Sequence, residues 1–161
     1  MPAQEGSSLR KADKLGKSDP YCLVYWNGRE LHKTAVIRQT LDPKWKGAEG
    51  KGERVELPRR RATGAESPGD ELIIEVWDRD YGTSDDFLGG LRLTEDALVR
   101  ALEGGGEMVA TLGDTMFIDH GTSALSEKRT AARMAAQGKI SGELRVHLAV
   151  PWETAGDEGE D

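Results

Sequence analysis

Five aspartates in two short clusters could together hold a hard metal cation. The first cluster contains Asp13 and Asp19, and the second contains Asp78, Asp80 and Asp86. Each cluster borders an apolar, β-prone run, so its carboxylates lie where a strand meets a loop. Crowded carboxylates repel one another and need a cation to be tolerated, and calcium takes about 6–8 oxygen ligands. The pattern indicates a cation site, and the alternative is a set of aspartates that cap turns.

The second cluster does not have the pattern of an EF-hand loop. Counted from Asp78, the fifth position is Gly82 instead of Asp or Asn, and the sixth is Thr83 instead of Gly. The twelfth is Gly89 instead of Glu, and no helices flank the loop. The carboxylates are therefore expected on loops between strands.

Short β-prone runs separated by Gly, Pro and charged breaks predict the elements that position these loops, in an all-β sandwich. An Asn27-Gly28 turn is expected to close the first hairpin. The expected strands are residues 21–26, 31–39, 54–57, 71–77, 87–93, 116–118 and 143–150. A short helix is expected at 95–102, before three glycines. A second, at 127–137 with Ser126 as its N-cap, would be an insertion lying on the sandwich before the last strand.

Four motifs in order along the chain resemble the C2 domain family, the calcium- and phospholipid-binding module of protein kinase C and the synaptotagmins. Residues 16–21 read G-K-S-D-P-Y, and Asp13 lies six residues before Asp19. Residues 40–45 read T-L-D-P-K-W, with Asp42 where the family usually has Asn. Residues 76–80 read V-W-D-R-D and residues 86–89 read D-F-L-G. The resemblance spans about residues 9–93 and implies a Greek-key antiparallel β-sandwich.

The resemblance implies a ligand set for two or more calcium ions. The coordinating side chains would be Asp13, Asp19, Asp78, Asp80 and Asp86, with Thr83 as a hydroxyl ligand and the carbonyls of Lys14 and Arg79 completing the shells. Asp85 would be an additional, solvated acid. Leu15, Lys17 and Tyr81, at the loop tips, would contact an anionic phospholipid surface.

Charge and composition exclude other classes of function. The net charge is −7, of which residues 153–161 carry −5, so the body carries −2 and two calcium ions would change it to +2. The single cysteine, Cys22, excludes an internal disulfide, suits a reducing cytosol and is expected to be buried. The three histidines are scattered without metal or nucleophile spacing, so no enzyme is expected. Residues 59–61 are the only arginine run and give no support for nucleic-acid binding.

The N-terminal residues depart from the family. Residues 1–9 are rich in Gly, Ser and Pro and are not expected to form the family's first strand, which a second protomer or a longer parent chain would then supply. They also lack the apolar region of a signal peptide. The expected organisation is a disordered segment at 1–8, a C2-like sandwich at 9–152 and an acidic disordered tail at 153–161.

Together these features predict a calcium-dependent, phospholipid-binding module that is cytoplasmic and becomes peripheral to the membrane when calcium binds. The alternative is a calcium-independent module for protein–protein interaction, in which the sandwich presents a surface and the aspartates are ordinary loop acids.

Overall fold

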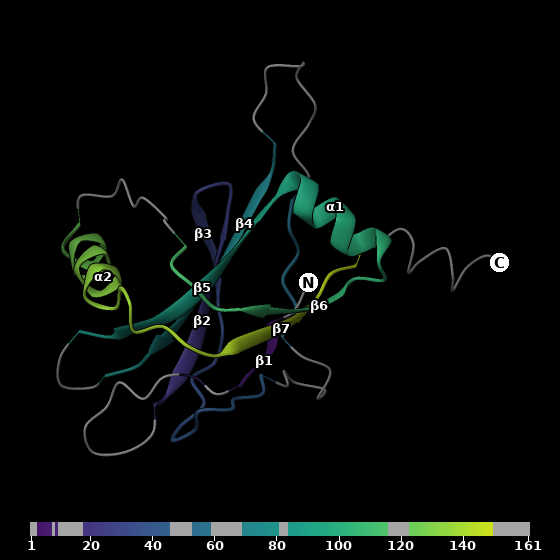
Figure 1. The fold of residues 1–161 in the computed structure, drawn as a ribbon. Coiled ribbons are helices and arrows are strands. Elements are labelled where there is room, and N and C mark those ends of the chain that lie inside the picture. The colour runs from purple at the N-terminus through teal and green to yellow at the C-terminus, as the bar shows by residue number, and fades with distance from the viewer. Residues whose placement is uncertain are drawn as a thin grey trace.

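Two antiparallel sheets pack face to face in this computed structural model, which describes residues 3–7, 9, 18–45, 53–58, 69–80, 84–115 and 123–149. The four-stranded sheet has the order β3-β2-β4-β5, and the three-stranded sheet has the order β1-β7-β6 (Figure 1). The strands are β1 (Ala3–Ser7), β2 (Pro20–Trp26), β3 (Arg29–Lys33), β4 (Glu71–Asp78), β5 (Asp86–Thr94), β6 (Glu107–Thr111) and β7 (Glu143–His147). The predicted β-sandwich is confirmed.

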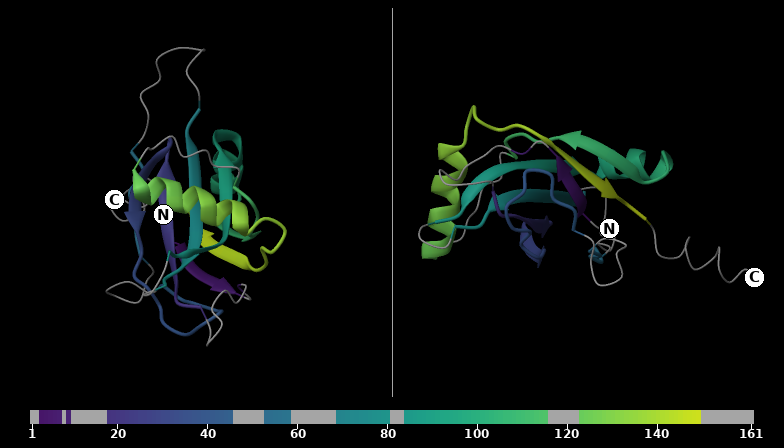
Figure 2. Two further views of the ribbon diagram at one scale, coloured as in Figure 1. Left: turned by 90° about the vertical axis from the view of Figure 1, so that its left-hand side faces the viewer. Right: turned by 90° about the horizontal axis from the view of Figure 1, so that it is seen from below.

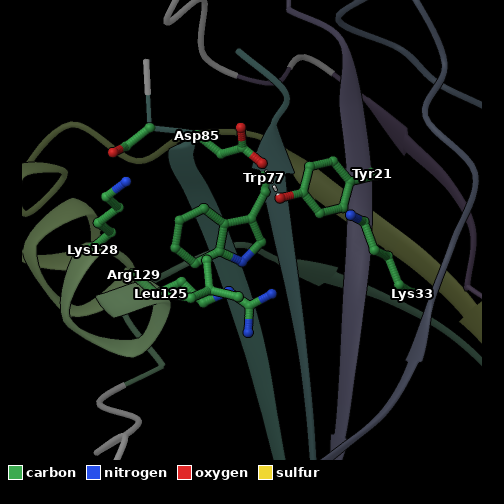
Figure 3. A pocket seen from close by; sticks show the side chains of 8 residues that line it. Tyr21, Lys33, Trp77, Asp85, Leu125, Lys128 and Arg129 are labelled. Atoms are coloured by element: carbon green, nitrogen blue, oxygen red, sulfur yellow. Dashed lines mark hydrogen bonds between the residues drawn. The ribbon is translucent and has the colours of Figure 1, made fainter. Parts of the chain in front are cut away.

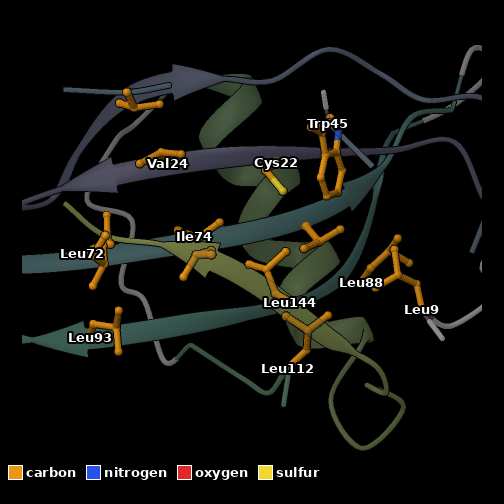
Figure 4. Packing of buried hydrophobic residues seen from close by; sticks show 14 of the residues in the cluster. Leu9, Cys22, Val24, Trp45, Leu72, Ile74, Leu88, Leu93, Leu112 and Leu144 are labelled. Carbon is orange, nitrogen blue, oxygen red and sulfur yellow. The ribbon is translucent and has the colours of Figure 1, made fainter. Parts of the chain in front are cut away.

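The core between the sheets comes from alternate residues of the strands. Cys22 and Val24 of β2 and Ile74 of β4 point inward to meet Leu144 of β7 (Figure 4). Trp45 closes one end, and its indole N–H donates to the carbonyl of Ala35 at 2.8 Å. The remaining buried members are Leu9, Val55, Leu72, Val76, Leu88, Leu93, Leu98, Leu112, Val146 and Leu148. Burial raises the pKa of the Cys22 thiol well above its usual value, as expected of a structural cysteine.

The first hairpin follows the prediction at its turn and departs from it afterwards. Asn27 and Gly28 both have positive φ, at 53° and 85°, which the two-residue turn requires. The second strand of the hairpin was predicted to reach residue 39, but β3 ends at Lys33. Residues 34–40 continue beside β2 through single hydrogen bonds, such as that from Ile37 N–H to the carbonyl of Pro20 at 3.0 Å. The predicted strand at 54–57 is not formed.

The prediction that the N-terminal residues cannot form a strand was wrong. β1 pairs antiparallel with β7, with Gly6 opposite Leu144. Strand pairing uses backbone groups and does not need apolar side chains on an edge strand. The Gly6 N–H also donates to the carbonyl of Pro43 at 2.9 Å, and Leu9 is buried just beyond the strand. This edge of β7 is therefore filled from within the chain, and a second protomer is not needed to fill it.

The end of the chain also differs in detail. β6 was not predicted, because its apolar residues Met108, Val109 and Ala110 are consecutive, so the sequence lacks the apolar–polar alternation of a half-buried strand. The strand predicted at 116–118 lies outside the described residues, as do residue 150 and the acidic tail. The domain boundaries at 8 and 152 stay predictions, although β1 lies inside the segment expected to be disordered.

In the described part of the chain, two helices flank the sandwich. α1 (Glu95–Glu103) follows β5, with Thr94 as its N-cap. α2 (Ala124–Ala135) lies across the outer face of the four-stranded sheet (Figure 2). Its N-cap is Ser123, not Ser126 as predicted, so the helix begins three residues earlier. Within the described residues, neither helix is long and apolar enough to cross a membrane.

Candidate functional site

Three of the predicted ligand residues lie at the same end of the four-stranded sheet. Asp19 directly precedes β2, Asp78 ends β4 and Asp86 begins β5. The register pairs Asp78 with Pro20 on one side and with Asp86 on the other. Neighbouring antiparallel strands thus bring acids from distant parts of the sequence to the same end of the sheet, as the sequence predicts.

Asp78 joins the two aspartate-bearing segments. It has no exposed surface, and its Oδ1 accepts a hydrogen bond from the Asp19 N–H at 2.9 Å. The Arg79 N–H donates in turn to the carbonyl of Asp19 at 3.0 Å. These bonds set the chain after β4 against the chain before β2, so the positions of the two aspartates are fixed relative to each other.

Asp19 links the cluster to a third segment. It is 7% exposed, and its Oδ1 accepts from the Gln39 N–H at 2.8 Å. Gln39 has a φ of 55°, which non-glycine residues rarely adopt. The Thr40 N–H donates to the carbonyl of Ser18 at 2.8 Å. The start of the segment carrying the T-L-D-P-K-W motif therefore holds Asp19 in place.

Asp85 has a structural role in the second cluster, which corrects the expectation that it is merely solvated. Its Oδ1 accepts from the Asp80 N–H at 3.0 Å, and its Oδ2 accepts from the hydroxyl of Tyr21. Burial, and then the nearby Asp85 carboxylate, raise the pKa of Tyr21 above its usual range. Asp85 therefore holds the backbone at Asp80, and Tyr21 holds Asp85.

The described residues contain only part of the predicted site. Asp13, Lys14, Leu15, Lys17, Tyr81 and Thr83 lie outside them. Among the residues that are described, no three acidic, histidine or cysteine side chains are grouped so that they could hold a metal ion. The side chains at this end of the sheet offer carboxylate oxygens, which are the ligands that calcium prefers.

A buried ion pair that the sequence did not reveal fixes α2 to the outer face of the sheet. Glu75 of β4 has no exposed surface, and it accepts hydrogen bonds at 2.8 Å from both Nε and Nη2 of Arg133. Thr115 Oγ1 donates to the same carboxylate at 3.0 Å. The Arg133 guanidinium also lies over the ring of Trp77, 5.5 Å from its centroid. The strict alternation of β4, which puts Glu75 on the face opposite the core, was the available signal.

A pocket of about 250 Å³ lies between α2 and the start of β5. Figure 3 shows Lys33 on one side of the pocket and Lys128 on the other, with Trp77 between them. The remaining lining residues are Tyr21, Ser84, Asp85, Leu125 and Arg129. Because Tyr21 and Asp85 line it, the pocket adjoins the end of the sheet that carries the aspartates.

Comparison with known sequences identifies relatives over much of the chain. A C2 domain family model matches residues 3–108. A Drosophila melanogaster multiple C2 and transmembrane domain-containing protein is 37% identical over 90 residues, which are 56% of this chain and 9% of that protein. Mouse Ras GTPase-activating protein 4 is 35% identical over 94 residues, which are 58% of this chain and 10% of that protein. The chain thus matches about a tenth of the length of each relative.

Solved structures agree in fold. A C2 domain of plant extended synaptotagmin 1 has a TM-score of 0.54 at 16% identity, covering 92% of this chain and 93% of that one. Human GIVD cytosolic phospholipase A2 has a TM-score of 0.52 at 18% identity, covering 90% of this chain and 15% of that one. C2 domains are generally calcium- and phospholipid-binding modules without catalytic activity of their own. With its four motifs, its sandwich topology and a family match over residues 3–108, this chain belongs to the C2 domain family.

Proposed function

We propose that this domain binds anionic phospholipid membranes in a calcium-dependent manner. The observation that carries the proposal is the strand register, which sets Asp78 beside both the start of β2 and Asp86. Asp19, Asp78 and Asp86 therefore lie at the same end of the sheet. Asp80 follows two residues after Asp78. Such a concentration of carboxylates at one end destabilises the domain unless a cation compensates it.

The five aspartates would hold two or more calcium ions. Asp13 and the hydroxyl of Thr83, with the carbonyls of Lys14 and Arg79, would complete the set. Bound calcium would supply positive charge and coordination positions for lipid phosphate. Leu15, Lys17 and Tyr81 would then contact the headgroup region. The domain would be cytoplasmic without calcium and peripheral to the membrane with it.

The net charge of the domain predicts how membrane binding depends on salt. Without residues 153–161 the chain carries −2, and two calcium ions would bring it to +2. Each positive charge near an anionic leaflet is worth about 1 kcal/mol, and the attraction fades within about one Debye length. Binding should therefore weaken as the salt concentration rises.

The test is co-sedimentation with vesicles of phosphatidylcholine and phosphatidylserine, in millimolar calcium and in EGTA, with thermal melts of the free protein alongside. We expect the wild type to bind only in calcium, and to melt several degrees higher in calcium because a ligand at 100 times its Kd stabilises the native state by about 2.7 kcal/mol. Asp80→Asn should abolish most of both effects.

Asp96→Asn is the matched control. It removes the same charge from the exposed first turn of α1. This helix follows the end of β5 that is opposite Asp86. It should leave binding and the melt shift intact. Equal binding in calcium and EGTA, or coincident melts, would contradict calcium dependence and favour the alternative, a calcium-independent module for protein interaction.

A further inference from the structure

β6 is an edge strand, and β7 lies between it and β1 (Figure 1). In the part of the chain that the structure describes, the five residues of β6 form backbone hydrogen bonds with β7 alone. A strand that is paired on one side leaves a row of N–H and C=O groups unused on the other side. β6 therefore has one open edge.

The hydrogen-bond ladder identifies the residues that face this open edge. At the start of β6, the Leu148 N–H donates to the carbonyl of Gly106 at 2.7 Å. At its end, the Leu112 N–H donates to the carbonyl of Gly142 at 2.9 Å. Hydrogen-bonded pairs alternate along an antiparallel ladder, so the even-numbered residues of β6 direct their backbone groups to β7. The open edge therefore consists of the odd-numbered residues Glu107, Val109 and Thr111.

The other sheet edges among the described residues are bridged or charged. β1 is bridged to Lys44, and β5 is bridged to Gly113. Charged side chains on an edge oppose pairing with another chain, and β3 carries Arg29, Glu30, His32 and Lys33. β6 has one charged residue, at its first position, followed by three consecutive apolar residues. Its sequence therefore lacks the charges that keep strand edges apart.

The side chains of β6 suit a second copy of the same strand. In an antiparallel pair centred on Val109, this residue faces its own counterpart, and it is 49% exposed in the single chain. Glu107 then faces Thr111 of the second copy, and Met108 faces Ala110. Like charges directly opposite each other would weaken such a pair, and this register has none. A register centred on Glu107 would instead set two carboxylates face to face.

We propose that β6 pairs antiparallel with β6 of a second copy, so that two three-stranded sheets join into one. Each residue of the open edge would exchange two hydrogen bonds with its counterpart. Two five-residue strands bury less than the ~1,200 Å² of a stable complex, so the dimer is weak and forms at high concentration.

The pairing also fixes how the two copies are oriented. Gly113, just after β6, is bridged antiparallel to Gly90 of β5, so β6 runs toward the aspartate-bearing end of the domain. An antiparallel pair reverses this direction in the second copy. The aspartate-bearing ends of the two copies therefore point in opposite directions.

Cysteine cross-linking without calcium or lipid tests the register. The native Cys22 has no exposed surface and does not interfere. Val109→Cys should form a disulfide between copies under mild oxidation, because Cα atoms about 5.5 Å apart in a hydrogen-bonded pair are within reach of a disulfide. Thr111→Cys should cross-link poorly alone and well when it is mixed with Glu107→Cys. Met134→Cys, at a residue that is 64% exposed on α2, is the control for random collisions.

Charge variants test the dimer without a cross-link. In sedimentation velocity with EGTA, the mean mass of the wild type should rise toward twice the monomer mass as concentration rises. Val109→Lys sets two lysines face to face and should weaken association at least about fivefold. Mixing it with Val109→Glu should restore association, because opposite charges then face each other. Met134→Lys adds the same charge on α2, against the other sheet, and should associate as the wild type does.

The pairing needs neither calcium nor lipid, so its failure is distinct from failure of the proposed function. A wild type that stays monomeric up to about 1 mM would overturn the pairing. Equal weakening by Val109→Lys and Met134→Lys would do the same, as would Thr111→Cys alone cross-linking as strongly as Val109→Cys. Dimerisation without calcium-dependent vesicle binding would support the pairing and overturn the proposed function.

Discussion

At the scale of single residues, the second aspartate cluster depends on a phenol outside it. The Tyr21 hydroxyl donates to Asp85, and Asp85 accepts from the Asp80 N–H. Tyr21 belongs to β2, which pairs with β4 through Tyr21 opposite Trp77. The loop geometry at Asp80 is thus tied to the sheet by one side chain and not only by the two strands that flank the loop.

Tyr21→Phe isolates this hydroxyl. The aromatic ring under Lys33 is kept, while the carboxylate of Asp85 loses a donor. Because hydrogen bonds to charged groups contribute about 1.5–3 kcal/mol, and this one is only partly buried, we expect the free energy of unfolding to fall by about 1–2 kcal/mol. Urea denaturation monitored by tryptophan fluorescence measures it. Superimposable curves for variant and wild type would show that the hydroxyl contributes nothing.

Tyr25 predicts how stability changes in alkali. Burial, and then the Glu75 carboxylate, raise the pKa of Tyr25 from 10.0 to about 12. The folded state therefore holds the phenolic proton more tightly than the unfolded state, so this stability is fully present below about pH 10 and is lost as pH rises to about 12. The loss amounts to about 2–3 kcal/mol. Thermal melts between about pH 8 and 12 measure it, and Tyr25→Phe should flatten the decline relative to wild type.

The sequence predicts which acids lie near one another, but not which of them accepts a hydrogen bond from the loop backbone. Asp19, Asp78 and Asp86 flank β-prone runs, and antiparallel pairing brings such positions together. The role of Asp85 depends on Tyr21, which is 64 residues away. Spacing along the chain does not reveal this contact, because the contact depends on the rotamer of one side chain and on the register of two strands.

At the scale of elements, α2 and the four-stranded sheet form a second, smaller core. Ala132 and Ala136 of the helix segment pack on Leu23 and Trp77 of the outer sheet face, together with Tyr21, Tyr25, Ile73 and Phe87. The Arg133–Glu75 pair lies within this contact. Small side chains on the helix let it approach the aromatic residues closely, and the ion pair sets its rotation.

Arg133→Ala should cost about 3–5 kcal/mol, because it leaves the Glu75 carboxylate buried without its counter-charge. The double variant Arg133→Met with Glu75→Leu removes both charges at similar volume and should recover most of the loss. Urea denaturation compares the free energies of unfolding. A double variant as unstable as Arg133→Ala would mean that packing, not the charge, holds the helix. Hydrogen exchange should show lost protection in α2 for the single variant.

The helix was predicted, and its start was not. Ser126 and Ser123 both precede helix-forming residues, but the Ser126 N–H donates to Ser123 Oγ at 3.1 Å, which makes Ser123 the cap. The earlier start adds the turn that carries Leu125. The alternation of faces along β4 would have indicated an outward Glu75, but nothing in the helix sequence alone distinguishes Arg133, which is buried, from Arg129, which is half-buried.

At the scale of the whole molecule, the fold is closed by its first and last strands. β1 pairs with β7, and Glu5 also bridges to Lys44 beside the other sheet. Strand patterns predicted β2 and β4 of the four-stranded sheet well, because these strands are rich in buried β-branched and aromatic residues. They failed for β1 and β6, which are edge strands whose sequences lack a regular apolar–polar alternation. An edge strand is therefore hard to predict from its own residues, because its pairing partner must also be known.

Deletion of residues 1–7 tests this closure. The edge of β7 would lose the partner that runs from Ala3 to Ser7, and an unpaired edge invites pairing with another chain. We expect the free energy of unfolding to fall by about 2–4 kcal/mol from the lost backbone hydrogen bonds. Light scattering should show self-association that grows with concentration. Glu5→Ala is the control, since its ion pair with Arg145 spans 3.9 Å near the surface and is worth under about 1 kcal/mol.

The pairing of β1 with β7 also determines when the domain can be finished during synthesis. Glu5 is opposite Arg145, so the first strand cannot pair with β7 until 140 further residues have been added. At about 5–20 residues per second, a ribosome needs roughly 7–30 s to make them. Once residue 94 has been made, β2 to β5 can form a sheet, while the β7 side of the core stays open to chaperones and to neighbouring chains. Slowing translation between the codons for β5 and β7 should therefore increase aggregation of the nascent chain more than slowing it earlier.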